Sequence, residues 1–222
     1  MSDTDLYGSQ SPFRRLPALS AGSALARQMG TYLVIGALVA AAVRAASGAL
    51  PSVQIALSLP ELGWGLAGVL AYAAYNAVIP QLLSRARPGK SLLGWMARRN
   101  LALFGKLPLW TLLMMAALAG PAEELIFRGW LQPVAGLWTA SLVFALAHFP
   151  PSRYRWSHPA TWGMIALYFP VGVLVGALYA WRGNLSAPIL MHSLSDSLGV
   201  LVLARAVAKP RARSEPADTA RP

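Results

Sequence analysis

The 222-residue chain is 56% hydrophobic and only 12% charged, and its mean hydropathy is +0.49. Soluble domains carry about 25% charged residues, so this composition excludes an ordinary water-soluble fold and indicates an integral membrane protein. Cysteine is absent, which excludes disulfides, cysteine nucleophiles and thiolate metal sites. A net charge of +11 is also typical of proteins that bind nucleic acid, but the positions of the basic residues give it another explanation.

Six apolar segments follow a polar N-terminal tail of residues 1–28. A helix needs about 20 apolar residues to cross a bilayer, and the segments lie at 30–47, 62–83, 102–120, 136–149, 160–181 and 184–205. The fourth is the shortest. Residues 207–222 are polar and basic, and we expect them to form a disordered tail. The sequence thus predicts an all-α, polytopic transmembrane helical bundle over residues 29–206, with about six spans.

Most basic residues fall in the segments that six spans would place on one side of the membrane. They are Arg14, Arg15 and Arg27 before the first span, Arg85, Arg87, Lys90, Arg98 and Arg99 after the second, Arg153 and Arg155 after the fourth, and Arg205, Lys209, Arg211, Arg213 and Arg221 at the C-terminal end. The other side would hold Arg44, Arg128 and Arg182. Positive charge marks cytoplasmic loops, so we expect both termini to be cytoplasmic and the protein to lie in a bacterial plasma membrane. The charge then serves topology and lipid attraction, and we expect no nucleic-acid partner.

Two adjacent glutamates stand within the apolar part of the chain, where ionisable residues are costly and usually functional. Gly120-Pro121 interrupts the third apolar run, and Pro121 suits the first turn of a new helix. We therefore expect a break there, with Glu123 and Glu124 in that first turn, where the helix dipole favours negative charge. Glu124 and Arg128 are four apart and share a face, which leaves Glu123 free. An interfacial cap with an ion pair would explain the same residues without catalysis.

Two further clusters contain histidine. Phe144 and His148 are four residues apart, and His192 and Asp196 repeat that spacing inside the sixth segment, so each pair would share a helix face. A charged aspartate within a span needs a partner, a proton, a metal or water. His148 by itself is equally compatible with an interfacial or core role. Counting along straight spans puts Glu123 and the two histidines at different depths, so a shared site requires tilt, a broken third span or a water-filled cavity.

Together the three clusters supply the groups that hydrolysis needs. A carboxylate can act as general base on water, and imidazoles can orient the water and stabilise an oxyanion. Glutamate and histidine are also zinc ligands, so zinc is the one cofactor that the sequence suggests. The candidate ligands are Glu123, His148, His192 and Asp196. Neither the HExxH helix of zinc proteases nor the Gly-x-Ser-x-Gly elbow of serine hydrolases occurs in the chain.

These clusters resemble the motifs of the CAAX-processing and bacteriocin-processing (Abi/CPBP) intramembrane proteases, the family of the Rce-type CAAX endopeptidase. The family signature is Glu-Glu-x-x-x-Arg, then Phe-x-x-x-His, then His-x-x-x-Asn or Asp. In this chain the signature reads Glu123-Glu124-Leu-Ile-Phe-Arg128, Phe144-Ala-Leu-Ala-His148 and His192-Ser-Leu-Ser-Asp196. The resemblance covers about residues 108–200.

The resemblance implies an intramembrane endopeptidase that hydrolyses a peptide bond of a membrane-associated protein or peptide precursor. Glu123 with His148 would activate water, and His192 with Asp196 would stabilise the oxyanion. The pair that would hold the geometry of the site is Glu124 and Arg128. Both a metal-dependent and a metal-free, glutamate-dependent mechanism fit this resemblance.

Two other functions stay open at this point. The first is a non-catalytic membrane protein, such as an immunity factor or a maturation partner. The second is a transporter with a His–Asp proton relay, although the first two spans offer few polar residues beyond Asn76. Asp196 also departs from the commoner asparagine of the resembling family, which puts a second carboxylate where a neutral donor is expected.

Overall fold

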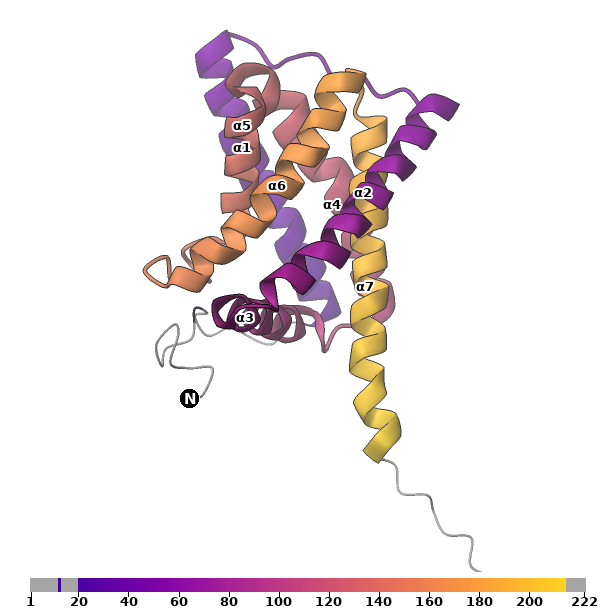
Figure 1. The fold of residues 1–222 in the computed structure, drawn as a ribbon. Coiled ribbons are helices and arrows are strands. Elements are labelled where there is room, and N and C mark those ends of the chain that lie inside the picture. The colour runs from indigo at the N-terminus through magenta and orange to yellow at the C-terminus, as the bar shows by residue number, and fades with distance from the viewer. Residues whose placement is uncertain (1–11, 13–19, 215–222) are drawn as a thin grey trace, which may run out of the picture.

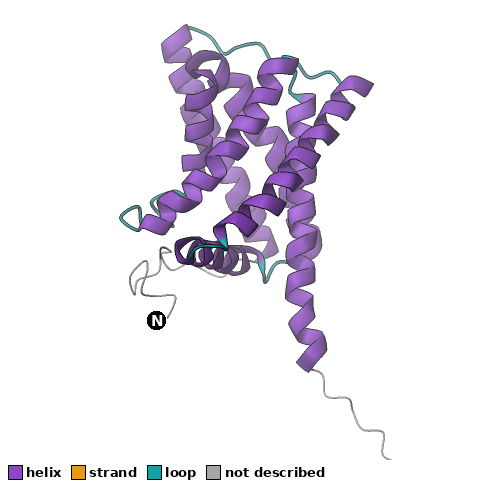
Figure 2. Ribbon diagram, viewed as in Figure 1, coloured by secondary structure: helices purple, strands orange, loops and turns teal. Residues whose placement is uncertain are grey.

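The structure is a computed structural model that describes Pro12 and residues 20–214, with side chains as far as Arg205. The described part is helical, with short connections between the helices (Figures 1 and 2), and it confirms the all-α prediction. The helices are α1 (Ala21–Ser47), α2 (Leu59–Leu83), α3 (Arg87–Phe104), α4 (Leu109–Glu124), the π-helical η1 (Leu125–Leu131), α5 (Gln132–Ala147), α6 (Pro159–Arg182) and α7 (Ser186–Ser214).

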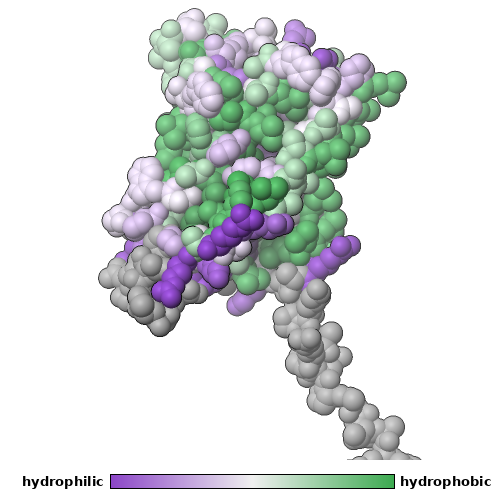
Figure 3. All heavy atoms as spheres, viewed as in Figure 1, coloured by the Kyte–Doolittle hydropathy of each residue, from purple (hydrophilic) through white to green (hydrophobic). Residues whose placement is uncertain are grey.

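Five helical stretches in the described part are long and apolar enough to cross a membrane. They are Ala21–Ser47, Leu59–Leu83, Leu109–Ala147, Pro159–Arg182 and Ser186–Arg205. Large apolar side chains on them face outward, including Leu33, Leu38 and Leu70. A surface of this kind is costly in water and favourable in lipid. Figure 3 shows it as a broad apolar band, with strongly hydrophilic side chains gathered at the lower end. The protein is therefore a multi-pass membrane protein.

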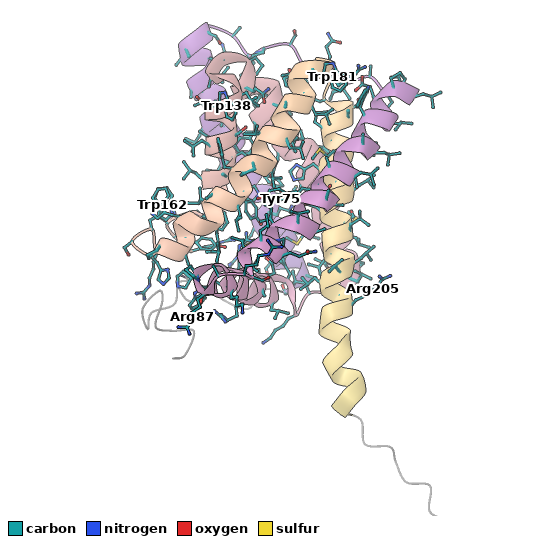
Figure 4. All side chains as sticks on the ribbon, in the orientation of Figure 1. Tyr75, Arg87, Trp138, Trp162, Trp181 and Arg205 are labelled. Carbon is teal, nitrogen blue, oxygen red and sulfur yellow. The ribbon has the colours of Figure 1, made fainter. Side chains whose placement is uncertain are left out.

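Exposed tryptophans lie toward both ends of this apolar band. Trp138 and Trp181 lie near the upper end in Figure 4, and Trp162 lies near the lower end. Tryptophan prefers the membrane–water interface, where its apolar ring and its N–H group are both satisfied. The tryptophans thus mark the two borders of the bilayer around the bundle.

The helix that begins at Leu109 turns back on itself at Gly136. Gly136 has φ 81° and ψ 165°, a conformation that glycine adopts readily and other residues rarely. A side chain at Gly176 of α6 would meet both Gln132, before the turn, and Leu137, after it. The second arm, residues 137–147, corresponds to the segment predicted at 136–149. It is only about 16 Å long, too short to cross a bilayer alone, so the number of full spans stays a prediction.

The break expected at Gly120-Pro121 is absent, and that prediction was wrong. Pro121 lies inside α4, and the helix continues through η1. The span also begins at Leu109 rather than at 102, so Glu123 and Glu124 lie near the middle of the helix and not in a first turn. Gly120 has a different role, because a Cβ there would collide with Ser193 Oγ and crowd the backbone of α7. This glycine allows α4 and α7 to contact each other closely.

Residues 87–104, which we expected to form a basic loop and the start of a span, form the helix α3. It lies across one end of the bundle, between α2 and α4 in the chain (Figure 1). Leu92 and Met96 pack into the core, whereas Arg87 and Arg98 are exposed. An amphipathic basic helix is suited to the membrane interface. We call this end of the bundle, where Figure 4 also shows Arg87 and Arg205, the basic end.

The described chain starts and finishes at the basic end (Figure 1). This agrees with the predicted arrangement of the termini on one side, and their cytoplasmic location stays a prediction. The two predicted tails are partly helical, because α1 begins at Ala21 and α7 continues to Ser214. The rest of both tails lies outside the described residues.

Candidate active site

Glu124 and Arg128 form an ion pair buried inside the bundle. Nη1 of Arg128 lies 3.2 Å from Oε1 of Glu124, and the two side chains are 1% and 0% exposed. Nη2 of Arg128 donates to the carbonyl of Gly172 at 3.0 Å, and the guanidinium lies 4.3 Å from the centre of the Phe144 ring. The predicted pairing is confirmed, but the placement of Arg128 on the outer side was wrong, because the helix continues past it. The pair joins the helix of Glu124 to α5 and α6.

His192 of α7 contacts the same carboxylate. Its Nδ1 lies 2.6 Å from Oε1 of Glu124. An ionised carboxylate only accepts hydrogen bonds, so Nδ1 donates and Nε2 faces the rest of the site. Nε2 lies 3.8 Å from Oε2 of Glu123 and 3.5 Å from Oδ2 of Asp196. The two residues predicted to share a face of α7 therefore do so, and His192 faces Glu123.

Glu123 also faces His148 at the end of α5. Oε2 of Glu123 lies 3.6 Å from Nε2 of His148. Nδ1 of His148 lies 2.8 Å from the carbonyl oxygen of Phe144, which can only accept, so Nδ1 donates and Nε2 is the basic edge of the ring. Distances of 3.6 and 3.8 Å are too long for direct hydrogen bonds, but one water can bridge them. Oε2 of Glu123 has no hydrogen-bond partner among the described residues.

Tyr32 of α1 belongs to this site, and the sequence analysis missed it. Its hydroxyl donates to Oε1 of Glu123 at 2.9 Å. The same hydroxyl accepts from Nε2 of Gln28 at 2.8 Å, and Nε2 also lies 2.9 Å from the carbonyl oxygen of Met115. The sequence signal was weak, since it consists of two polar residues four apart at the start of an apolar segment. The hydroxyl holds one oxygen of Glu123, so that the other oxygen faces the histidines.

These groups line a cavity of about 450 Å³. Along α7 its lining extends from Met191 and His192 to Leu203, and it includes Arg99 and Phe104 of α3. The cavity therefore extends from the site toward the basic end. It also solves the problem of depth, because Glu123 and the histidines lie at one level beside a space that can hold water and peptide.

No group of three or more histidine, aspartate or glutamate side chains among the described residues is arranged to hold a metal ion. Nδ1 of His192 and Nδ1 of His148 each donate to a protein oxygen, an arrangement that zinc-binding histidines also show. Only their Nε2 atoms face Glu123, at 3.6 and 3.8 Å. Zinc therefore stays a prediction, and we derive no step through a metal.

Residues 105–198 match the family model described as type II CAAX prenyl endopeptidase Rce1-like. This match confirms, over that stretch, the resemblance drawn from the three motifs. The chain is also similar to the uncharacterized protein YpbD of Bacillus subtilis (strain 168), with 36% identity over 99 residues. That alignment covers 45% of this chain and 49% of YpbD, so the chain spans about half the length of this relative. No solved structure matches the chain.

Proposed function

We propose that this chain is an intramembrane endopeptidase that hydrolyses a peptide bond of a membrane-associated protein or peptide precursor. The observation that carries the proposal is the convergence of Glu123, His148 and His192, from three helices, on one cavity inside an apolar bundle. Ionisable groups inside a membrane protein are costly, and a scaffold has no need to gather three of them around one space. The match of residues 105–198 to an endopeptidase family supports the same reaction.

The attacking water lies to one side of Oε2 of Glu123 and Nε2 of His148, which are 3.6 Å apart, and bonds both atoms. Tyr32 holds the other oxygen of Glu123, which fixes the direction of the carboxylate. Glu123 takes a proton from the water as the water oxygen bonds to the carbonyl carbon of the substrate. His148 accepts the second hydrogen bond from the water and orients it.

The oxyanion that forms in this step lies next to His192. With Nδ1 held by the carboxylate of Glu124, a proton on Nε2 makes the ring an imidazolium, and this second N–H donates to the oxyanion. The C–N bond then breaks, and Glu123 returns its proton to the leaving amine. Atoms and protons balance, since one water is added across one peptide bond. Arg128 acts only through Glu124, by holding the carboxylate that orients His192.

The proposal is tested by comparing membrane proteins in cells that make the wild-type chain, the Glu123→Gln variant or neither. Gln is nearly isosteric with Glu but cannot take a proton from water. We expect mass spectrometry to find new peptide ends only with the wild type, while both proteins reach the membrane in equal amounts. Cleavage that persists in Glu123→Gln would contradict the general-base role. A biological effect that survives this variant, without any cleavage, would favour a non-catalytic immunity or maturation partner.

A further inference from the structure

Arg99 of α3 is a buried cation with no carboxylate within 4.0 Å in the described part of the chain. It is 9% exposed. Its Nε donates to the Tyr154 hydroxyl at 2.7 Å, and its Nη1 donates to the Tyr168 hydroxyl and to Oδ1 of Asn100, both at 3.1 Å. Burial lowers the pKa of the Arg99 guanidinium, but Tyr168 and Tyr154 outweigh burial and raise this pKa above its usual range. An arginine guanidinium keeps its charge in proteins, and the acceptors of Arg99 are two tyrosine hydroxyls and one amide oxygen rather than a carboxylate.

Two ion pairs of the bundle, in which Arg128, Glu124 and Glu61 are buried and Arg182 is partly exposed, show how buried charge is balanced elsewhere in this fold. Arg128 is paired with Glu124, and Nη2 of Arg182 lies 2.6 Å from Oε1 of Glu61. Arg99 instead has aromatic rings around it, with centres 5.2 to 6.0 Å away. Aromatic rings compensate a cation only partly. Among the residues that the structure describes, the positive charge of Arg99 is thus not balanced by a carboxylate.

This charge borders the cavity that contains Glu123 and His148. One tyrosine ring separates Arg99 from the catalytic groups, because the Tyr168 ring lies 4.9 Å from the His148 ring and its hydroxyl bonds Arg99. None of the described hydrogen bonds uses Nη2 of Arg99, so at least one edge of the guanidinium has donors to spare. The gap of 4.9 Å between the two rings, the tyrosine ring itself and the hydrogen bond of 3.1 Å put the guanidinium on the order of 11 Å from His148. An extended peptide advances about 3.3 Å per residue, so the guanidinium lies within roughly four residues of the scissile bond.

We propose that Arg99 is an anion-binding subsite that holds a carboxylate of the substrate, within about four residues of the bond that is cut. This proposal rests on the proposed protease function and names the chemistry of its substrate. Guanidinium is the side chain best suited to carboxylate, because its N–H donors match the two carboxylate oxygens. Burial strengthens the attraction, since little water competes for it. The carboxylate belongs either to the free C-terminus of the substrate or to an acidic side chain.

A purely structural role makes a different prediction. Arg99 joins α3 to Tyr154 in the connection before α6 and to Tyr168 on α6. If that were its whole purpose, its loss would slow the cleavage of every peptide by the same factor. If Arg99 binds a carboxylate of the substrate, its loss should instead slow the cleavage of anionic substrates alone.

The experiment uses the purified full chain in lipid vesicles and two libraries of N-palmitoylated, randomised ten-residue peptides. One library has free C-terminal acids and the other has C-terminal amides, and mass spectrometry identifies the products. The wild type is compared with Arg99→Gln, with Arg99→Lys in case the Gln variant does not fold, and with Arg98→Gln. Arg98 is the exposed neighbour of Arg99 on α3. The control variant Arg98→Gln therefore changes the net charge by the same amount as Arg99→Gln.

We expect the wild type and Arg98→Gln to cleave the free acids at least about tenfold faster in kcat/KM than the amides, mainly through KM. Arg99→Gln should lose this preference while cleaving the amides at the wild-type rate, and Arg99→Lys should keep part of it. If the carboxylate is a side chain, the cleaved amides will instead be enriched in Asp or Glu near the cut, and only in proteins with Arg99.

Two results would overturn the inference. The first is a wild type that cleaves acids and amides equally with no enrichment of acidic residues. The second is an Arg99→Gln variant that slows every peptide by the same factor. A wild type that cleaves no peptide in either library, and that also leaves cellular membrane proteins intact, would instead count against the protease function itself.

Discussion

Helices α4 to α7 and helices α1 to α3 contribute different kinds of group to the same cavity. The later helices, within the stretch that matches the endopeptidase family, supply the carboxylates and imidazoles that contact one another. The earlier helices supply a hydroxyl that orients Glu123, from Tyr32, and a cation that borders the cavity, from Arg99. The difference suggests that reacting groups belong to the motifs, whereas orienting and substrate-binding groups come from the rest of the chain.

This division has a measurable consequence. Removal of a reacting group should stop the reaction, removal of a supporting group should lower stability and activity together, and removal of an orienting group should only slow the reaction. The following predictions run from the largest expected effect to the smallest.

The histidines give the largest effect. His148→Ala and His192→Ala should each lower kcat by roughly a thousandfold or more, and the double variant should be little worse than either, because groups that act as one unit lose their joint effect at the first removal. His158→Ala is the matched control. His158 caps α6, so its loss should cost about 1 kcal/mol of stability and leave kcat unchanged. Strictly multiplicative losses in the double variant would show that the two rings do not share a site.

Arg128 should affect folding as well as activity. Arg128→Ala leaves Glu124 without its cation in a buried position, at a cost of about 3 kcal/mol. Arg128→Lys should recover only part of this, because a single ammonium cannot reproduce the planar fork that bonds both Glu124 and Gly172. Thermal unfolding in detergent measures the effect, with the exposed Arg44→Ala as control. An Ala variant as stable as wild type would mean that the pair stabilises nothing.

Tyr32 tests the earlier helices directly. Tyr32→Phe removes one hydroxyl and leaves Oε1 of Glu123 without its donor. We expect kcat to fall about tenfold, as for the loss of one hydrogen bond to a charged group, while KM stays the same. Tyr179→Phe on α6 is the control, because Tyr179 does not line the cavity. A thousandfold loss would place Tyr32 among the reacting groups and break the division between the two parts of the chain.

The sequence predicted the contacts that lie within single helices. A spacing of four residues correctly paired Glu124 with Arg128 and His192 with Asp196, because a helix brings such residues to one face. It could not predict contacts between helices, such as the bond from Tyr32 to Glu123 across 91 positions of the chain. Those depend on how the helices pack, and one sequence carries no local signal for that.

The errors in the predicted fold also have physical causes. Gly120-Pro121 suggested a break, but Gly120 is required by the contact with α7, and the helix tolerates Pro121 within it. The true reversal lies at Gly136 in an apolar run, while Pro133, three residues earlier, lies in the first turn of α5 and marks no break. The helix α3 was missed because an amphipathic interfacial helix has too many charges to be recognised as a span and was taken for a loop.

The substitution of Asp196 by Asn should have the smallest effect on kcat. This variant tests whether every ionisable group of the later helices is a reacting group. Its side chain is 40% exposed and lies 3.5 Å from Nε2 of His192. Asp donates a hydrogen bond to an oxyanion only when it is protonated, whereas the amide of Asn donates at every pH. We therefore expect Asp196→Asn to keep kcat within roughly threefold of wild type and to extend activity to higher pH, where an aspartate donor is lost.

The same variant separates the two mechanisms that the motifs left open. If Asp196 were a charged metal ligand, its replacement by Asn would weaken metal binding, so activity would fall steeply and added zinc would restore it. If Asp196 only donates to the oxyanion, a strong chelator should leave the activity of the wild type and that of Asp196→Asn each unchanged at every pH. The measurement is a pH–rate profile of both proteins with and without chelator. An inactive Asp196→Asn that zinc restores would contradict the metal-free mechanism. Added zinc can repair weakened metal binding, but it cannot replace a lost hydrogen-bond donor.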